Sequence, residues 1–317
     1  MASIVTFGET MLRFTPPGDG RVETTGEMAV HVGGAESNVA VTAARLGLDA
    51  AWTSKLPDSP PGRRVVDGVR RHGVEPLVTW SDEGRQGLYY LEDGPEPLAS
   101  EVTYDRTGAP VRTATPDELP VERIRAADAF FVTGITPALS DTLAATTGEL
   151  LATARGAGTL TAFDVNYRAK LWTPTAARET LSDLLPDVDL LFVAERDADA
   201  VFDRAGDPAE VAAGFADDYD LGTAVLTRGE EGALAVRDGA VHDQDAFPAG
   251  SAHPVGSGDA FVGGYLARRL AGGGTDEALE YGAATAALKR GIPGDVAVVT
   301  PEQVRHVVEG GADGISR

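Results

Sequence analysis

The chain has 317 residues, and its 49 Asp and Glu residues against 27 Lys and Arg residues give a formal net charge of −22. This charge repels phosphate backbones and anionic lipid headgroups at long range, which disfavours nucleic-acid and membrane partners. Cysteine is absent, so disulfides, thiolate nucleophiles and cysteine-ligated metal centres are excluded. The length favours one large α/β domain or a main domain with a smaller appendage.

Strand-like and helical segments alternate along most of the chain, which is typical of a doubly wound, mainly parallel α/β sheet flanked by helices. We expect strands at residues 4–7, 50–53, 129–132, 160–164, 190–193 and 224–227. We expect helices at residues 35–46, 63–72 and 139–155, because each run of helical spacing is followed directly by a glycine.

Two segments interrupt this alternation, at approximately residues 10–31 and 85–113. They are rich in Gly and Pro and contain period-two runs at 87–91 and 101–104, which predict antiparallel strands. We therefore expect a single domain over residues 1–317 with a small inserted β-sheet that acts as a lid over the site.

Two features of composition bear on the location of the protein. The basic residues are 24 arginines and only three lysines, which indicates either adaptation to high intracellular salt or a GC-rich genome. We favour the first, because codon bias alone does not predict so large an excess of acids over bases. The amino terminus lacks a basic segment and a cleavage site, and no apolar run approaches about 18 residues, so we expect a cytoplasmic protein.

The segment at residues 253–267 carries the clearest chemical signal. Gly256 and Gly258 frame a tight turn before a helix expected to begin near Asp259. Backbone N–H groups of such a turn can converge on an anion beside the positive end of the helix dipole. A carboxylate there could accept the proton of an attacking hydroxyl, although Asp259 could equally serve as a helix cap.

Other nucleotide-binding motifs are missing. None of the three lysines is followed by Ser or Thr, which excludes a Walker A loop. The dinucleotide fingerprint requires a glycine where Phe261 stands, which weakens a hydride-transferring Rossmann enzyme. A second glycine turn, Gly33-Gly34, opens the helix at residue 35, and Asn38 in its first turns offers a donor and an acceptor to hydroxyl groups.

Together, the stretches at residues 33–40 and 256–261 resemble the two signatures of the ribokinase-like (PfkB) sugar kinases, G-G-x-x-x-N-x-A and G-A/S-G-D-x-F. The resemblance implies a ribokinase-like fold, ATP and Mg²⁺ as cofactors, Asp259 as general base, and an anion hole formed by the N–H groups of Gly256, Ser257 and Gly258. Within the family the chain is similar to 2-keto-3-deoxygluconate kinases, through residues 8–11, 134–140, 164–172 and 292–295.

This similarity implies two sets of binding residues. The sugar site would be lined by Gly34, Asn38, Tyr89, Tyr104, Arg106, Ile135, Arg168, Asp259 and Asp295. Arg106 and Arg168 would pair with the substrate carboxylate or with phosphate oxygens. The ATP site would be lined by Asn166, Arg168, Thr227, Arg228, Gly229, Gly232, Gly256, Gly258 and Ala287, with adenine near residues 282–287.

Two positions depart from the family pattern. The usual Asn-x-x-Glu, which helps to hold Mg²⁺ through water, is replaced by Ala194 and Asp197, so only the carboxylate of Asp197 is kept. The aspartate that binds an activating monovalent cation in some relatives is replaced by His253. Activation by a monovalent cation is therefore an open question from the sequence.

These features predict a kinase that transfers phosphate from ATP to the 6-hydroxyl of 2-keto-3-deoxygluconate. The alternatives are a related kinase for 2-keto-3-deoxygalactonate, fructose or ribose, or a non-catalytic sugar or nucleotide sensor. Nothing in the sequence resolves the configuration at C4. Because the inserted sheet has edges that need covering, we also expect a homo-oligomer, a dimer or higher.

Overall fold

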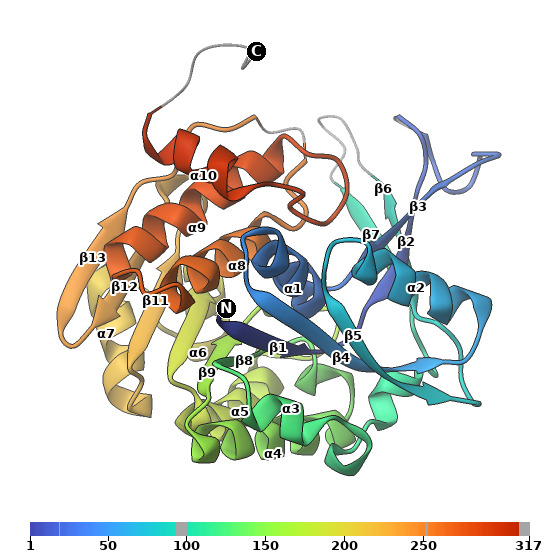
Figure 1. The fold of residues 1–317 in the computed structure, drawn as a ribbon, viewed down its shortest axis with the longest axis horizontal. Helices are drawn as coiled ribbons and strands as arrows, with labels where there is room; N and C mark the ends of the chain where they lie inside the picture. The colour runs from blue at the N-terminus through green and yellow to red at the C-terminus, as the bar shows by residue number, and fades with distance from the viewer. Residues whose placement is uncertain (19, 93–99, 251–252, 311–317) are drawn as a thin grey trace.

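A nine-stranded sheet organises the computed structural model, which describes residues 1–18, 20–92, 100–250 and 253–310 (Figure 1). The strand order is β13-β12-β11-β10-β9-β8-β1-β4-β5. The bounds are β1 (Ser3–Phe7), β4 (Asp49–Pro57), β5 (Glu75–Ser81), β8 (Ala129–Thr133), β9 (Leu160–Asp164), β10 (Leu190–Ala194), β11 (Thr223–Thr227), β12 (Ala233–Arg237) and β13 (Ala240–Gln244). Neighbouring strands from β5 to β11 are parallel, and β12 and β13 add an antiparallel edge. The predicted α/β fold is confirmed.

Helices cover both faces of this sheet. One face carries α3 (Val121–Arg125), α4 (Asp141–Ala157), α5 (Pro174–Leu184), α6 (Glu195–Phe202) and α7 (Pro208–Tyr219). The other carries α1 (Ala35–Arg45), α2 (Pro60–Arg70), α8 (Ser257–Leu270) and α9 (Thr275–Arg290), with α10 (Pro301–Val308) packed on α9. The short 3-10 helices are η1 (Pro110–Thr113), η2 (Pro116–Glu118), η3 (Pro137–Leu139), η4 (Leu185–Asp187) and η5 (Gly229–Glu231).

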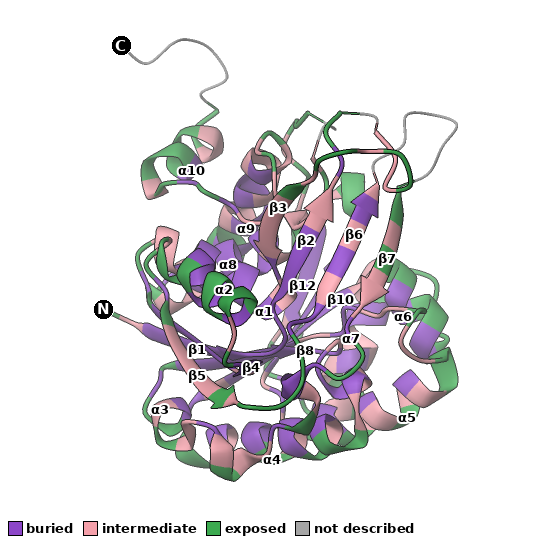
Figure 2. Ribbon diagram, turned by 90° about the vertical axis from the view of Figure 1, so that its right-hand side faces the viewer, coloured by how far each residue is buried: buried purple, intermediate pink, exposed green. Residues whose placement is uncertain are grey.

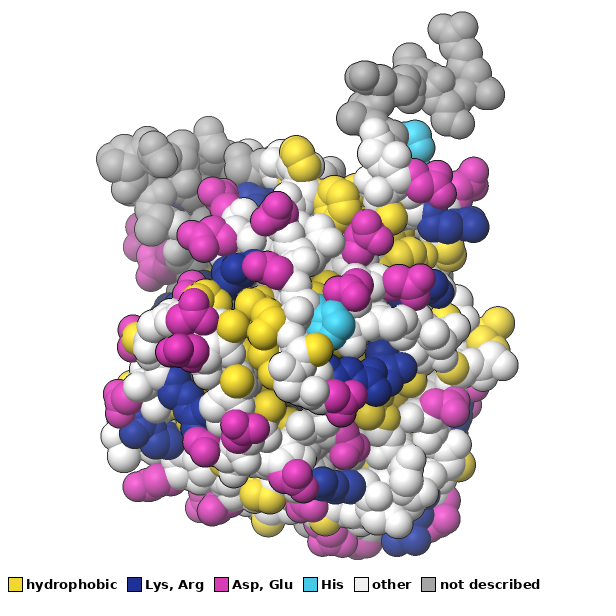
Figure 3. All heavy atoms as spheres, turned by 90° about the vertical axis from the view of Figure 1, so that its left-hand side faces the viewer, with side chains coloured by type: hydrophobic (Ala, Val, Ile, Leu, Met, Phe, Trp, Pro, Cys, Tyr) yellow, Lys and Arg dark blue, Asp and Glu magenta, His cyan; other side chains and the backbone are white. Residues whose placement is uncertain are grey.

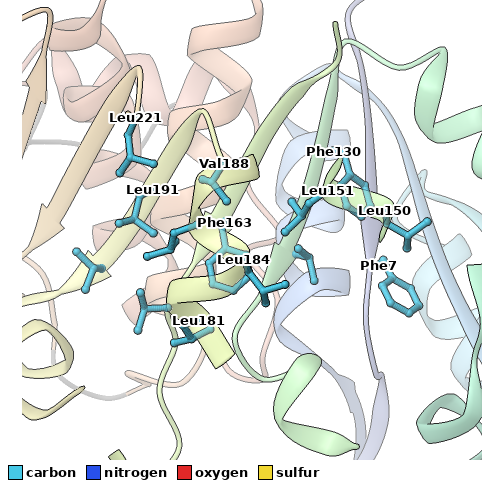
Figure 4. Close-up of a cluster of buried hydrophobic side chains, with 14 of the residues drawn as sticks. Phe7, Phe130, Leu150, Leu151, Phe163, Leu181, Leu184, Val188, Leu191 and Leu221 are labelled. Atoms are coloured by element: carbon cyan, nitrogen blue, oxygen red, sulfur yellow. The ribbon is translucent and has the colours of Figure 1, made fainter. Parts of the chain in front are cut away.

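The central strands are buried on both faces, which explains their nearly continuous hydrophobic sequences. In β8 all five residues are buried, and Phe130 lies close to Leu150 and Leu151 in one hydrophobic cluster (Figure 4). Phe163 of β9 and Leu191 of β10 extend the same cluster toward α5. This continuous core fixes the positions of the strand ends.

The predicted helices are present, but their bounds differ. The second ends at Arg70 rather than at residue 72, and the third continues through Gly156 to Ala157 rather than ending at residue 155. The second begins at Pro60 rather than at residue 63, because Ser59 caps it and prolines are tolerated in the first turn of a helix. The third begins at Asp141 rather than at residue 139, since the Ser140 side chain accepts a hydrogen bond from the Leu143 amide. The helix after the glycine turn begins at Ser257, which places Asp259 inside its first turn.

A second sheet of four strands lies beside the first, in the order β3-β2-β6-β7 (Figure 2). Its bounds are β2 (Met11–Thr15), β3 (Ala29–Gly33), β6 (Leu88–Glu92) and β7 (Glu101–Asp105). The two predicted segments therefore contribute two strands each, although residues 110–113 form η1 against β4 and α4 instead. The expected antiparallel pairing holds within each segment, but β2 and β6, which join the two segments, are parallel. Residues 19 and 93–99 of the predicted lid lie outside the described residues.

The topology brings several loops to one edge of the main sheet. The chain runs from β1 outward to β4 and β5, and then from β8 outward in the opposite direction, so the order reverses between β1 and β8. Ligands of open α/β sheets bind at the carboxyl ends of the strands beside such a reversal. The carboxyl ends of β1, β8, β9, β10 and β11 meet at this edge because these strands are parallel.

The surface carries the excess of acid seen in the composition. On the face shown in Figure 3, acidic side chains are spread among basic ones over the whole view. No helix in the described ranges is long and apolar enough to cross a membrane.

Candidate active site

Two adjoining cavities lie at the carboxyl edge of the main sheet. The first, the lid-side cavity, has a volume of about 520 Å³ and lies between the strand ends and the small sheet. The second, the hairpin-side cavity, has a volume of about 540 Å³ and lies between the β11–β12 turn and α9. Both are lined by the same six residues, namely Ala194, Arg196, Thr227, Pro254, Ser257 and Gly258. The two cavities therefore meet at the start of α8.

The glycine turn at this junction has a geometry that only glycine tolerates. Gly256 has φ of +79°, and a Cβ atom there would lie 2.0 Å from the carbonyl oxygen of Asp295. The amide of Ser257 donates a 3.1 Å hydrogen bond to the Pro254 carbonyl, so it is already engaged, contrary to the three-amide anion hole expected from the sequence. The amides of Gly258 and Asp259 belong to the first turn of α8, where an amide has no acceptor within its helix.

Asp259 lies at this junction and lines the lid-side cavity. Its Oδ2 accepts a 2.7 Å hydrogen bond from the side-chain amide of Asn38 on α1. Desolvation by burial raises the pKa of Asp259 to about 6, against the lowering effects of Asn38, Arg168 and Lys289. A carboxylate with this pKa is ionised at neutral pH and is still basic enough to accept a proton in a transition state.

Two further carboxylates lie near Asp259. Asp164, at the carboxyl end of β9, has a pKa raised to about 8 by burial and then by the charges of Asp259 and Asp197. Asp197 accepts a 3.2 Å hydrogen bond from the Tyr167 amide, and burial raises its pKa as well. Both line the lid-side cavity. The sequence indicated Asp197 but not Asp164, whose position at the end of a predicted strand was the available signal.

This crowding of carboxylates suits a divalent cation, because positive charge would offset their mutual repulsion. Among the described residues, however, no three acidic or histidine side chains are arranged to hold a metal ion directly. Asp164 and Asp197 would therefore hold Mg²⁺ through water, with donor phosphates completing its shell.

The small sheet brings several polar side chains into the lid-side cavity. Asp295 Oδ1 accepts hydrogen bonds from the Tyr89 hydroxyl at 2.8 Å and from Arg13 Nη1 at 3.2 Å. Asp295 Oδ2 is buried and has no hydrogen-bond partner among the described residues, and the residue lines the cavity. A substrate hydroxyl would satisfy this oxygen. Tyr104 packs beside Tyr89, with ring centroids 5.9 Å apart.

The two arginines expected at the substrate carboxylate differ in their surroundings. Arg106 is buried and already pairs with Glu9, with Nε 3.2 Å from Oε2, while its Nη2 has no hydrogen-bond partner in the described ranges. Arg168 is half-buried, and its Nη1 donates to the carbonyl of Tyr167 at 3.2 Å. Both line the lid-side cavity. Arg168 is therefore the more available cation, whereas the buried Arg106 still has its Nη2 group to offer.

The remaining predicted sugar-site residues are Gly34 and Ile135, and packing against neighbouring backbone explains the glycine. A Cβ atom at Gly34 would lie 2.2 Å from the Glu9 carbonyl, so the glycine is required by the adjacent backbone. Ile135 lines the cavity on the turn after β8. Glu36 holds this turn in place. Its Oε1 accepts hydrogen bonds from the Thr133 amide and from the hydroxyls of Thr133 and Thr136. The sequence analysis assigned no role to Glu36.

The hairpin-side cavity contains most of the predicted nucleotide residues. Thr227, Arg228, Gly229, Gly232, Gly258 and Ala287 line it. Arg228 pairs with Asp243 and donates to the Glu231 carbonyl, so its guanidinium is held on the hairpin rather than free for phosphates. The observed lining differs from the expected ATP site at three positions. These are Asn166, Arg168 and Gly256, which line the lid-side cavity instead.

An apolar wall of the hairpin-side cavity is suited to a flat base. It includes Phe247, Phe261, Ala283, Ala286 and Ala287. The three alanines lie at helical i, i+3 and i+4 spacing on α9, where small side chains leave room beside the helix. This helical spacing was the sequence feature that could have identified Ala283 and Ala286 as lining residues. No sequence feature pointed to Phe247.

Comparison with known proteins identifies the family. The family model described as pfkB family carbohydrate kinase matches residues 1–301. A relative from Haloferax volcanii named 2-dehydro-3-deoxygalactonokinase is 55% identical over 316 residues. The alignment covers 100% of this chain and 99% of the relative. A relative from Thermoproteus tenax named 2-dehydro-3-deoxygluconokinase is 30% identical over 98% of this chain and 95% of its own length.

Solved structures agree with this assignment. The crystal structure of 2-dehydro-3-deoxygluconokinase from Thermotoga maritima superposes with a TM-score of 0.91 at 30% identity, covering 98% of each chain. Since the family model and these relatives extend over nearly all of the sequence, the chain belongs to the pfkB family of carbohydrate kinases.

Proposed function

We propose that this kinase phosphorylates a 2-keto-3-deoxy sugar acid at its 6-hydroxyl and that its preferred substrate is 2-keto-3-deoxygalactonate, also called 2-dehydro-3-deoxygalactonate. The 55% identical relative carries the galactonate name, whereas the gluconate kinases from Thermoproteus tenax and Thermotoga maritima are 30% identical. The galactonate preference revises the gluconate substrate expected from the sequence. The gluconate epimer is the second candidate, supported by those more distant relatives.

The observation that carries the proposal is the junction of the two cavities at the start of α8. A sugar in the lid-side cavity and a nucleotide in the hairpin-side cavity would meet at Gly258, beside the carboxylate of Asp259. An acceptor hydroxyl and the terminal phosphate of ATP would thus be brought together at one point. Most of the rate enhancement of phosphoryl transfer comes from such positioning and from charge stabilisation.

The chemical step balances with the groups at this junction. The Asp259 carboxylate accepts the proton of the 6-hydroxyl as its oxygen attacks the γ-phosphorus. The bond between that phosphorus and the bridging oxygen of ADP breaks, leaving the 6-phosphate ester, ADP and a protonated Asp259. The amides of Gly258 and Asp259 stabilise negative charge on the transferring group, with the positive end of the α8 dipole behind them.

Mg²⁺ and ATP are the cofactors that we assign to this site. Bound Mg²⁺ supplies positive charge at the donor phosphates. Asp164 and Asp197 would hold it through water, and the alanines of α9 with Phe247 would contact the adenine. The small sheet covers the lid-side cavity, so its position would exclude water from the transferring phosphate and suppress hydrolysis of ATP.

Recognition of an acid substrate would come from Arg168 and from the free Nη2 of Arg106. A neutral sugar has no group to balance these cations, which argues against fructose and ribose. The hydroxyls of the substrate would form hydrogen bonds with Asp295 Oδ2 and with the side-chain amide of Asn38. Because the protein charge is −22, this recognition depends on a few local cations and not on the overall field.

A panel of acceptors tests the proposal. Both 2-keto-3-deoxy epimers, fructose and ribose would be supplied with ATP and Mg²⁺, and ADP release and the site of phosphorylation would be measured. We expect the highest kcat/KM with the galactonate epimer, lower turnover with gluconate, and little with neutral sugars. A reversed epimer order would favour the gluconate candidate, and sugar binding without ADP release would indicate a sensor.

A further inference from the structure

Lys289 is an unusual residue of this site. It lies in the last turn of α9 and is 0% exposed, although lysine is rarely buried. Its Nζ donates hydrogen bonds to the backbone carbonyls of Ile292 at 3.0 Å and His253 at 3.4 Å. No carboxylate in the described part of the chain lies within ion-pair distance of this ammonium, so peptide carbonyls are its nearest acceptors.

The two carbonyls belong to two different loops of the site. His253 precedes the glycine turn that leads to Asp259, and Ile292 precedes Asp295. These loops are already in contact, because Gly256 packs directly on the Asp295 carbonyl. The His253 amide also donates to the Arg290 carbonyl at 3.2 Å, which ties the first loop to the end of α9. The ammonium thus joins the loop of the proposed base to the loop of the sugar-site carboxylate.

The charge of Lys289 also acts on both carboxylates. Desolvation by burial lowers the pKa of Lys289, while the charges of Asp295 and Asp259 oppose this and favour the ammonium. The lysine in turn lowers the pKa of Asp259. A purely packing role would not need this charge, since a methionine fills a similar volume. Such a methionine would leave two buried carbonyls without a donor. A cation held by backbone carbonyls and facing carboxylates is the environment that a bound monovalent metal ion would have.

We propose that the Lys289 ammonium is a tethered cation that positions the glycine turn and the Asp295 loop, so that this enzyme needs no free monovalent cation for activity. The inference rests on the proposed kinase function of the same site. Lys289 is a positioning residue, because it would act through His253 and Ile292 and touches neither substrate.

The test uses two variants and an exchange of cations. Lys289→Met removes the charge at similar volume, and Lys55→Met is the control, since Lys55 pairs with Glu118 and lines neither cavity. Activity on the preferred sugar acid and the melting temperature would be measured in K⁺, NH₄⁺ or tetramethylammonium chloride at one multimolar concentration. Tetramethylammonium maintains the screening but is too large to enter the space of an ammonium group.

We expect Lys289→Met to lose on the order of 10²-fold in kcat, the cost of a small misplacement of reacting groups. K⁺ and NH₄⁺ should restore part of this activity and raise the melting temperature of the variant relative to tetramethylammonium. The wild type and Lys55→Met should respond to the three cations within about twofold of one another. The selective rescue is the readout that a merely structural lysine would not give.

Three results would overturn the inference. They are near-normal activity of Lys289→Met in tetramethylammonium, a loss of activity that is the same in all three cations, and a wild type that requires K⁺. If Lys289→Met fails to fold, the wild-type cation exchange still decides. Failure of the proposed function is separable, because it would appear as absent wild-type turnover on every sugar acid, while the melting temperatures would still report the cation response.

Discussion

The side-chain amide of Asn38 donates a 2.7 Å hydrogen bond to Asp259, a residue 221 positions later in the chain. Asn38 belongs to the first glycine motif and Asp259 to the second, so one contact joins the two sequence signatures. Because the amide donates to the carboxylate, it favours the ionised form that a general base requires.

Replacing the proposed base tests its role directly. Asp259→Asn should lower kcat by roughly 10²–10⁴, the usual contribution of a general base, because an amide cannot accept the hydroxyl proton. ATP affinity, measured by calorimetry, and the melting temperature should change little. Near-normal turnover of this variant would remove Asp259 from the mechanism.

The Asn38 hydrogen bond should set the acid limb of the pH profile. In the wild type we expect kcat/KM to fall as the pH decreases through about 6, where Asp259 becomes protonated. Asn38→Ala removes an interaction that lowers this pKa, so its acid limb should move to higher pH. The neighbouring Ser37→Ala, whose hydroxyl donates to the Gly34 carbonyl, is the matched control and should keep the wild-type midpoint.

Arg168 should determine affinity for the acid substrate. Arg168→Ala should raise the KM for the sugar acid by about 10- to 100-fold, because a charge-assisted hydrogen bond is lost. Arg196→Ala provides the comparison, since Arg196 lines both cavities but its side chain is 80% exposed and pairs with Asp197. Equal effects of the two substitutions would show that only the general charge of the cavity matters.

Glu36 should make folding stability depend on pH. Burial raises its pKa from 4.5 to about 7, so the folded chain retains a proton that the unfolded chain has released between these values. The free energy of unfolding should therefore decrease by about 3 kcal/mol from this group as pH rises from 4.5 to 7. Glu36→Gln should remove that part of the slope in denaturant titrations at both pH values. An unchanged slope would contradict the assignment.

Gly256 and Gly258 should respond differently to alanine. At Gly256 a methyl group would meet the Asp295 carbonyl and the backbone is left-handed, so we expect a loss of about 1–3 kcal/mol and of activity. At Gly258 a methyl group meets nothing within 4 Å, so the melting temperature should stay close to that of the wild type. Equal melting temperatures of the two variants would refute the packing explanation.

Much of the architecture was determined by local sequence. Continuous hydrophobic runs identified six parallel strands but missed β5, and helical spacing followed by glycine identified three helices, because burial and backbone freedom act over a few residues. Helix starts were less well predicted at Ser59 and Ser140, where capping side chains extended or shortened the helix. The small sheet was also predicted, although the strand pairing that joins β2 to β6 could not be read from either segment alone.

The residue types of the site came from the sequence, but their partners came from the fold. The motif at 256–259 identified Asp259 as a candidate base. Only the folded chain shows that the Ser257 amide donates a hydrogen bond to the Pro254 carbonyl and that Arg106 pairs with Glu9. Glu36 and Asp164 lie inside stretches that carry the family resemblance but had no role assigned to them, and Lys289 lies in no motif. Their roles arise from burial and from charges brought close by distant segments, and a linear sequence does not record either.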